Sequence, residues 1–375
     1  MTNDKKIKLI SQNTAEVMTE EDLKKMIESG QPLNHYIGFE ISGMVHLGTG
    51  LVCMQKVKDI MDAGVNCHVF LADWHSWIND KLGGDRKKIA KFAHDYFAHT
   101  LKLCFEVLGG NSKKLTFVLG SDLYKENNQF WETVVEISKN TTLARMKRSI
   151  TIMGRNEGDA VDFAKLMYPA MQVSDIFTMQ IHLPHAGNDQ RKAQVIARDV
   201  AMKLKINPLK LGENIVKPVG IHHKLLLGLQ KPSVWPIPDE MNKQDLWSTM
   251  KMSKSVPNSA VFVHDSEEEI RQKIAKAFCP EGEVEFNPII DWVENLVFTH
   301  QDKLIIKRKP EHGGDMELNS IEELKKTFAK GELHPMDLKN AVAEFLIDLL
   351  KPIRDEFDKP EKKELLRELN SIVSR

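Results

Sequence analysis

The amino-acid sequence predicts an α/β protein in which a doubly wound parallel sheet with a helical insertion is followed by an all-α C-terminal domain. Short apolar runs alternate with helix-length stretches through the first part of the chain, and this alternation is typical of a parallel sheet covered by helices. After about residue 260 the strand-like runs stop, while residues that cap helices recur. These two patterns set the fold class.

Composition excludes several classes of protein. The 375 residues, 42% hydrophobic and 28% charged, are ordinary for a globular chain of roughly two or three compact units. With 52 basic and 53 acidic residues, contacts with nucleic acid must come from local patches. The four cysteines lie far apart without a CxxC pair, which argues against a disulfide framework or a metal site in the protein. No apolar run approaches about 18 residues, so we expect a cytoplasmic protein without a membrane segment.

Helix-capping signals mark both ends of the chain. Residues 1–34 are expected to form an N-terminal helical segment, whose helix begins at Thr19 and ends before Gly30. Residues 260–375 are expected to form the helical C-terminal domain. There, a serine followed three positions later by a glutamate predicts two helix starts, at Ser266 with Glu269 and at Ser320 with Glu323.

Residues 35–259 are expected to form the sheet domain. Helix-length stretches at 47–63 and 86–108 separate the first strands. About residues 125–165 interrupt the alternation with consecutive helical patterns and several basic residues, and we interpret them as an insertion at the edge of the sheet. The expected strands are residues 36–39, 67–72, 115–119 and 181–183.

A glycine-rich turn follows the first strand. The residues from Gly38 to Gly50 read GFEISGMVHLGTG and run directly into a helix. Glycines at such a turn let a nucleotide approach the backbone, and the helix start offers free N–H groups to phosphates. Alone, the turn with its single His46 is equally compatible with a plain structural turn.

A second motif, KMSKS, occupies residues 251–255. Lysine carries a mobile point charge that can follow a departing phosphate, and the serines add small donors on a flexible loop. Such a loop can close over a triphosphate, although a solvated basic loop is the simpler alternative. The preceding stretch, residues 231–250, shows little periodicity, and we interpret it as a loop of unassigned role.

Together, HLGTG and KMSKS resemble the two signature motifs of class I aminoacyl-tRNA synthetases. The segments YIGFEISGMVHLG, FLADWHSWIND, YPAMQVSDI and ELHPMDLKNAV are similar to segments of archaeal-type tyrosyl-tRNA synthetases, and the resemblance extends from Tyr36 to Phe357. It implies a Rossmann-like catalytic domain at 35–259 and an anticodon-binding domain at 260–375. The implied reaction activates tyrosine with ATP to tyrosyl-adenylate and transfers the tyrosyl group to the 3′ end of tRNA(Tyr).

The resemblance also implies roles for the residues of both motifs. Thr49 stands where the family usually has a second histidine; it keeps a hydroxyl donor but no cationic form, which shifts part of the phosphate stabilisation to the lysines. Mg²⁺ is expected to arrive with ATP, held mainly by phosphates and water. The implied catalytic residues are His46, Gly48, Thr49, Lys251 and Lys254, and the implied ATP-binding residues are Gly38, His46, Gly48, Met252, Ser253 and Lys254.

A pocket for the amino acid is implied at the far end of the same sheet edge. Tyr168, Gln172 and Asp175 fall at i, i+4 and i+7 of one helix face amid apolar neighbours, which favours a pocket wall over a solvated surface. By resemblance, Tyr36 and Asp175 bind the phenol of tyrosine, and Tyr168, Gln172 and Gln190 hold its ammonium group. Asp73 and His75 match pocket-lining positions, although His75 is equally compatible with a structural histidine.

Contacts with tRNA are expected in two places. By resemblance, Arg148 and Arg191 approach the acceptor stem, whereas His334 and Asp337, with His312 stacking, read the first anticodon base. A homodimer formed through the insertion is likewise implied by the resemblance alone.

Three other functions stay open at this point. A tryptophanyl-tRNA synthetase shares the fold, a small-molecule nucleotidyltransferase shares the histidine-bearing turn, and a noncatalytic tRNA-binding paralogue shares the overall layout. The paired motifs disfavour the paralogue, since a binding protein has no need for Lys251 and Lys254.

Overall fold

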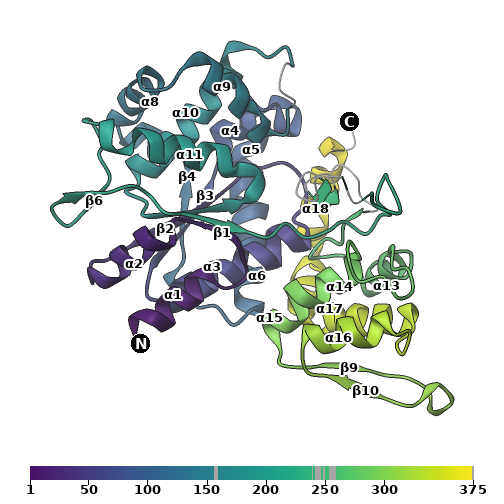
Figure 1. The fold of residues 1–375 in the computed structure, drawn as a ribbon. Coiled ribbons are helices and arrows are strands. Elements are labelled where there is room, and N and C mark those ends of the chain that lie inside the picture. Colours follow the sequence, from purple (N-terminus) through teal and green to yellow (C-terminus); the bar gives the residue numbers. More distant parts are fainter. Residues whose placement is uncertain (156–158, 239, 241–245, 248–249, 253–258, 374–375) are drawn as a thin grey trace.

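The computed structural model describes residues 1–155, 159–238, 240, 246–247, 250–252 and 259–373. A central sheet covered by helices forms the first part of the molecule, and a mainly helical part follows it (Figure 1). The first part begins with α1 (Asn3–Ser11), β1 (Thr14–Met18), α2 (Glu20–Glu28), β2 (Asn34–Phe39), α3 (Cys53–Asp62), β3 (Asn66–Leu71), α4 (Asp73–Ile78), α5 (Arg86–Phe92), α6 (His99–Val107) and β4 (Thr116–Leu119).

The second half of the sheet part contains the predicted insertion and the remaining strands. Its elements are α7 (Gly120–Glu126), α8 (Gln129–Lys139), α9 (Leu143–Ser149), α10 (Phe163–Thr178), β5 (Leu183–Gly187), α11 (Arg191–Val200), β6 (Lys210–Leu211), β7 (Asn214–Ile215) and β8 (Gly220–His223).

Six strands form the central sheet in the order β1-β8-β5-β2-β3-β4. All neighbouring pairs are parallel except β1 with β8. From β2 the chain proceeds first to β3 and β4 on one side and then to β5 and β8 on the other. The order therefore reverses between β2 and β5, and open α/β sheets bind ligands outside the carboxyl ends of the strands at such a reversal. The predicted fold class is confirmed.

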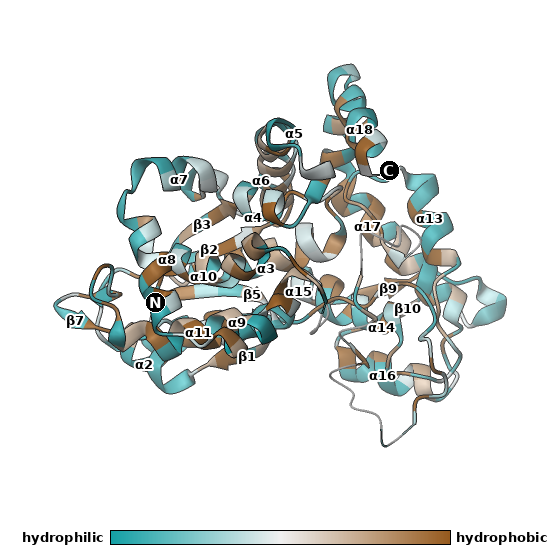
Figure 2. Cartoon of the chain, turned by 90° about the horizontal axis from the view of Figure 1, so that it is seen from above, coloured by the Kyte–Doolittle hydropathy of each residue, from teal (hydrophilic) through white to brown (hydrophobic). Residues whose placement is uncertain are grey.

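Successive side chains of the strands face two different hydrophobic cores, as a pleated strand requires. In β2, Tyr36 joins the core beneath α8 and α10, whereas Ile37 joins the core beneath α3 and α6. In β3, Phe70 and Val69 divide in the same way. Viewed from above, β2 and β3 are largely hydrophobic along their length, while the outer helix α7 is largely hydrophilic (Figure 2).

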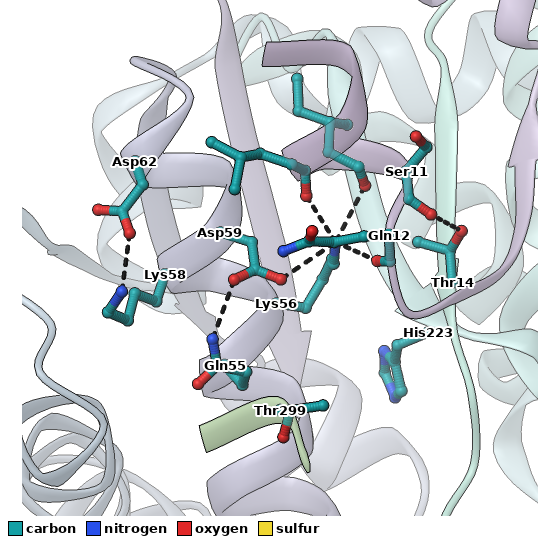
Figure 3. Close-up of polar contacts among 12 residues, drawn as sticks. Ser11, Gln12, Thr14, Gln55, Lys56, Lys58, Asp59, Asp62, His223 and Thr299 are labelled. Atoms are coloured by element: carbon teal, nitrogen blue, oxygen red, sulfur yellow. Dashed lines mark hydrogen bonds and ion pairs between the residues drawn. The ribbon is translucent and has the colours of Figure 1, made fainter. Parts of the chain in front are cut away.

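The N-terminal segment, predicted to be helical, also supplies an edge strand to the sheet, because β1 pairs antiparallel with β8. Lys56 of α3 anchors this segment: its ammonium group donates to the backbone carbonyls of Leu9, Ile10 and Gln12 at 2.9, 3.0 and 2.6 Å (Figure 3). Burial lowers the pKa of Lys56 to about 8. The strand escaped prediction because it is short and half exposed, with little apolar periodicity.

The C-terminal part packs against α6 through α17 (Pro335–Phe357), and His99 of α6 lies 3.0 Å from Glu356 of α17. The capping box of Ser266 and Glu269 is present, whereas the hairpin of β9 and β10 adds two short strands to a region predicted to be all helical. Among the described residues, no helix is long and apolar enough to cross a membrane. The elements are α13 (Glu267–Ala275), α14 (Pro288–Trp292), α15 (Phe298–His300), β9 (Leu304–Ile306), β10 (Met316–Leu318), α16 (Ile321–Ala329), α17 (Pro335–Phe357) and α18 (Pro360–Val373).

Candidate active site

Two adjoining cavities lie where the strand order reverses between β2 and β5. The inner cavity, of about 210 Å³, reaches toward α10, and the outer cavity, of about 610 Å³, reaches toward the glycine-rich turn. Gly38, Glu40, Ala186 and Gln190 line both cavities. A ligand can therefore extend from one into the other.

A buried carboxyl group forms the deep end of the inner cavity. Asp175 is 1% exposed and accepts a hydrogen bond of 2.9 Å from the phenol of Tyr124, while His75 lies 3.7 Å away on its other oxygen. Burial raises the pKa of Asp175 well above its ordinary value. Tyr36 lines the same cavity, and burial together with the nearby Asp175 raises the pKa of its phenol. This end can exchange hydrogen bonds with a hydroxyl group.

Sequence reasoning missed Tyr124 because no motif marks it. Its ring stacks on Phe130 at 3.8 Å between centroids, in the core of the insertion. His75 is buried, and burial lowers the pKa of its imidazole to about 3, so the ring beside Asp175 is neutral.

The mouth of the inner cavity carries polar side chains from α10 and from the turn after β5. The phenol of Tyr168 donates to Glu40 at 2.9 Å, and the amide of Gln172 donates to Gln190 at 3.3 Å. Gln190 is itself fixed by donating to the carbonyl of Ile152 at 2.8 Å. Glu40, which sequence reasoning did not select, places a carboxylate where an ammonium group can be bound.

Asp73 was predicted to line this pocket, but the structure places it outside the cavity lining. Its carboxylate accepts a hydrogen bond of 3.0 Å from the backbone N–H of Ser121 and so fixes the turn between β4 and α7. The added Cβ of any residue replacing Gly120 would lie 2.7 Å from this carboxylate. Asp73 thus has a structural partner, while its neighbour His75 lines the cavity.

The glycine-rich turn forms one wall of the outer cavity. His46, Gly48 and Thr49 all line it, and the hydroxyl and N–H of Thr49 each lie 3.3 Å from a ring nitrogen of His46. A Cβ on Gly48 would press on the His46 ring at 3.1 Å, which explains the glycine there. The helix start is a π-helical turn, η1 (Gly48–Val52).

The second motif and the segment after it frame the same cavity. After the motif, the backbone carbonyl of Val261 accepts from the N–H of Leu47 at 3.1 Å, next to His46. Within the motif, the N–H of Met252 donates to the carbonyl of Leu226 at 2.8 Å. Lys251 lines the cavity, and its ammonium group pairs with Asp189 at 2.6 Å. The structure thus brings the two motifs together, whereas Ser253 and Lys254 lie outside the described residues.

Comparisons with known proteins agree with this arrangement. The family model of class I tRNA synthetases (W and Y) matches residues 28–351. The chain is a class I tRNA synthetase. It is 56% identical to the tyrosine–tRNA ligase of Thermococcus kodakarensis over 372 residues, which are 98% of this chain and 99% of that protein.

Solved structures resemble the synthetase over its whole length. A crystal structure of a tyrosyl-tRNA synthetase with L-tyrosine from Pyrococcus horikoshii superimposes with a TM-score of 0.95 at 54% identity, covering 98% of this chain and 100% of that one. The tyrosyl-tRNA synthetase of Aeropyrum pernix gives 0.81 at 38% identity, covering 98% and 99%.

The residues predicted to contact tRNA fall into two groups, one in the sheet part and one in the C-terminal part. In the first group, Arg148 lies near Arg191, because the ammonium group of the adjacent Lys192 donates to the carbonyl of Arg148 at 2.8 Å. Arg191, at the start of α11, donates to both oxygens of Glu16 at 2.7 and 2.9 Å, so its guanidinium is occupied in this state. Arg148 is exposed on α9. In the C-terminal part, His312 is exposed, His334 caps α17 by accepting from the N–H of Met336, and Asp337 lies in the first turn of α17.

Proposed function

We propose that the synthetase is a tyrosine–tRNA ligase, which forms tyrosyl-adenylate from tyrosine and ATP and then esterifies the 3′ end of tRNA(Tyr). The observation that carries this proposal is the buried pair of Asp175 and Tyr124 beside Tyr36, at the deep end of a cavity that opens into the outer cavity. When tyrosine enters the inner cavity, its phenol meets these hydrogen-bonding partners. Its carboxylate then faces the outer cavity.

The pocket selects tyrosine because a side chain without a hydroxyl group leaves buried hydrogen-bonding groups of the protein unpaired. Phenylalanine fills the same space but gives Asp175 and Tyr36 no hydrogen bond, and an unpaired buried polar group costs about 1–3 kcal/mol. Tyrosine satisfies both groups. At the other end, Glu40, Gln172 and Gln190 offer oxygen acceptors to the substrate ammonium group, which fixes the carboxylate toward the outer cavity.

Activation then depends on alignment and on charge stabilisation. The tyrosine carboxylate attacks the α-phosphorus of ATP and pyrophosphate leaves, so no nucleophilic side chain is needed. His46 and Lys251 line the cavity that holds the phosphates in this proposal, and they stabilise the charge on the departing group. Lys254 is assigned the same role from its motif.

Magnesium accompanies ATP in this proposal. The ion is expected to be bound chiefly by phosphate oxygens and water. Because a tRNA ligase works where translation takes place, the proposal includes a cytoplasmic location.

Two further partners belong to the proposal. The transfer step requires tRNA(Tyr), with Arg148 and Arg191 at the acceptor stem and His312, His334 and Asp337 at the anticodon. The second partner is another copy of the chain, in a homodimer formed through the insertion. The helices of the insertion carry three exposed apolar side chains, Val135, Leu143 and Phe163, with exposed fractions of 59%, 62% and 76%. Multi-angle light scattering of the full chain tests the dimer: a monomer mass at micromolar concentration contradicts it.

Exchange of labelled pyrophosphate into ATP, measured with each of the twenty amino acids in turn, tests the reaction. We expect tyrosine alone to support exchange. Stimulation by tryptophan alone would reassign the substrate, and no exchange with any amino acid, even with tRNA present, would identify a noncatalytic tRNA-binding paralogue.

A further inference from the structure

Three neighbouring strands carry buried histidines that touch ring to ring. His35 of β2 lies 3.1 Å from His185 of β5, measured from Nε2 to Nδ1, and Nε2 of His185 lies 2.9 Å from Nδ1 of His223 in β8. The last ring continues to Cys53 of α3, whose sulfur is 3.5 Å from Nε2 of His223. We call these four residues the histidine chain. Its histidines are 0%, 1% and 7% exposed.

The hydrogen bonds of the histidine chain are all donated in the same direction, from His35 toward Cys53. Burial keeps all three rings neutral, because it lowers the pKa of His35 to about 3 and of His223 to about 4, and that of His185 well below its ordinary value. A neutral imidazole donates from one nitrogen and accepts at the other. Nδ1 of His35 is buried without a hydrogen-bond partner among the described residues, and burying a lone pair there is less costly than burying an N–H.

His35 therefore carries its proton on Nε2 and donates to Nδ1 of His185. His185 in turn must hold its proton on Nε2, which donates to Nδ1 of His223, and His223 donates to the sulfur of Cys53. The reverse order would leave an N–H of His35 buried and unpaired. The hydrogen-bond geometry thus assigns the Nε2–H tautomer to all three rings.

The histidine chain runs beneath the junction of the two cavities. His185 lines the inner cavity, whereas His223 and Cys53 line the outer one. β5 continues from His185 directly into Gly187 and the turn η6 (Asn188–Gln190), which carries Asp189, the partner of Lys251, and Gln190. Any displacement of His185 is therefore transmitted to residues of both cavities.

Replacing a matched hydrogen-bonded set by apolar side chains of similar shape is often nearly neutral for stability. Stability alone thus gives no reason for three imidazoles on adjacent strands of a core that is mainly apolar. Their positions suggest a different use, since fixed and directional bonds between strands hold the strand ends at one spacing.

We propose that His185 is a positioning residue that couples the inner cavity to the outer cavity, so that tyrosine and ATP each strengthen the binding of the other. It does so by holding β2 and β8 at a fixed spacing from β5, through the bond it accepts from His35 and the bond it donates to His223. The proposal rests on the tyrosine–tRNA ligase function, and it names a residue that touches neither reacting group.

Two conservative variants separate the two bonds. In His185→Gln the amide N–H₂ takes the place of Nε2–H and keeps the donation to His223, whereas in His185→Asn the amide oxygen takes the place of Nδ1 and keeps only the bond from His35. Because His223 lines the outer cavity, we expect His185→Gln to retain coupling and His185→Asn to lose it. His94→Gln, at an exposed histidine on the turn η3 (Ala93–Ala98), is the matched control.

Coupling is measured as the ratio of tyrosine dissociation constants without and with a non-hydrolysable ATP analogue, by titration calorimetry on the full chain. We expect a ratio of at least about fivefold in the unmodified protein and in the His94 control, and a ratio near one in His185→Asn. Equal ratios in both His185 variants and in the unmodified protein would overturn the proposal, as would a ratio of one in the unmodified protein.

A spectroscopic readout tests the proton direction independently. Long-range ¹H–¹⁵N correlation spectra of the imidazoles are expected to show the Nε2–H tautomer for His35, His185 and His223. An Nδ1–H tautomer at His185 contradicts the assigned direction and the proposal with it. The proposed ligase function fails separately, by absence of tyrosine-dependent pyrophosphate exchange in the unmodified protein.

Discussion

The ammonium group of Lys251 is paired with the carboxylate of Asp189 at 2.6 Å, across the cavity lined by His46 and Gly48. The first lysine of the KMSKS motif is thus held at the carboxyl edge of β5. In the proposed reaction, a triphosphate in this cavity competes with Asp189 for the lysine, and the negative charge of the leaving group develops beside this pair.

Lys251→Ala is expected to slow adenylate formation by about a hundredfold, because a charged donor to the leaving group is lost. The dissociation constant of tyrosine should stay unchanged, since Lys251 does not line the inner cavity. Rapid-quench measurement of adenylate formation and equilibrium tyrosine binding check the two parts. Lys102→Ala, at an exposed lysine of α6, serves as the control and should behave like the unmodified protein.

Asp175→Asn is expected to lower kcat/KM for tyrosine by about thirtyfold, equivalent to about 2 kcal/mol, because an N–H₂ group replaces one of the two buried oxygens that can accept from a phenol. Discrimination against phenylalanine should shrink by a similar factor. Tyr124→Phe, which removes only the hydroxyl that donates to Asp175, should have a smaller effect. Pyrophosphate exchange with both amino acids measures this, and unchanged discrimination in Asp175→Asn would remove that residue from the pocket.

Asp337→Ala is expected to lower kcat/KM for tRNA aminoacylation by about tenfold, because a carboxylate at the start of α17 no longer accepts from a base edge. Tyrosine-dependent pyrophosphate exchange should not change. Glu322→Ala, at the corresponding first turn of α16, removes a helix N-terminal charge without touching the predicted anticodon site. Equal losses of exchange and aminoacylation in Asp337→Ala would indicate damage to the fold instead.

The stability of the synthetase should carry a pH dependence from Asp291. This carboxyl group accepts from the N–H of Leu227 at 2.8 Å, and burial raises its pKa from 3.8 to about 7. The folded chain therefore binds the proton more tightly than the unfolded chain, and the free energy of unfolding falls as pH rises from about 4 to about 7. The full loss, about 4 kcal/mol, is present above pH 7.

Asp291→Asn removes this titration. Both proteins are unfolded with urea at several pH values between 4 and 8. The free energy of unfolding of the variant is expected to rise relative to that of the unmodified protein as pH rises through this window. A difference between the two proteins that is the same at every pH contradicts the assignment.

β2, β3 and β4 were predictable because each is a short apolar run next to a helix. β1 and β8 were not. β1 is half exposed, and β8 is only four residues long and contains two histidines, whose burial depends on partners that are distant in sequence.

The candidate site shows the same division between local and long-range information. Tyr168, Gln172 and Asp175 share a helix face that spacing reveals, and all three line one cavity. Tyr124 and Glu40 lack any local signal, because their importance comes from contacts with Asp175 and Tyr168, which are distant from them in sequence.

The pairing of β1 with β8 also sets the order in which the molecule can be completed. Thr14 lies opposite His223, so β1 finds its partner only after the whole stretch from Thr14 to His223 has been made. Until then Lys56, whose partners are the carbonyls just ahead of that strand, has a binding site only if α1 has already docked. A nascent chain stalled before residue 220 should therefore leave its amino terminus open to proteases, and release of the stall should protect it.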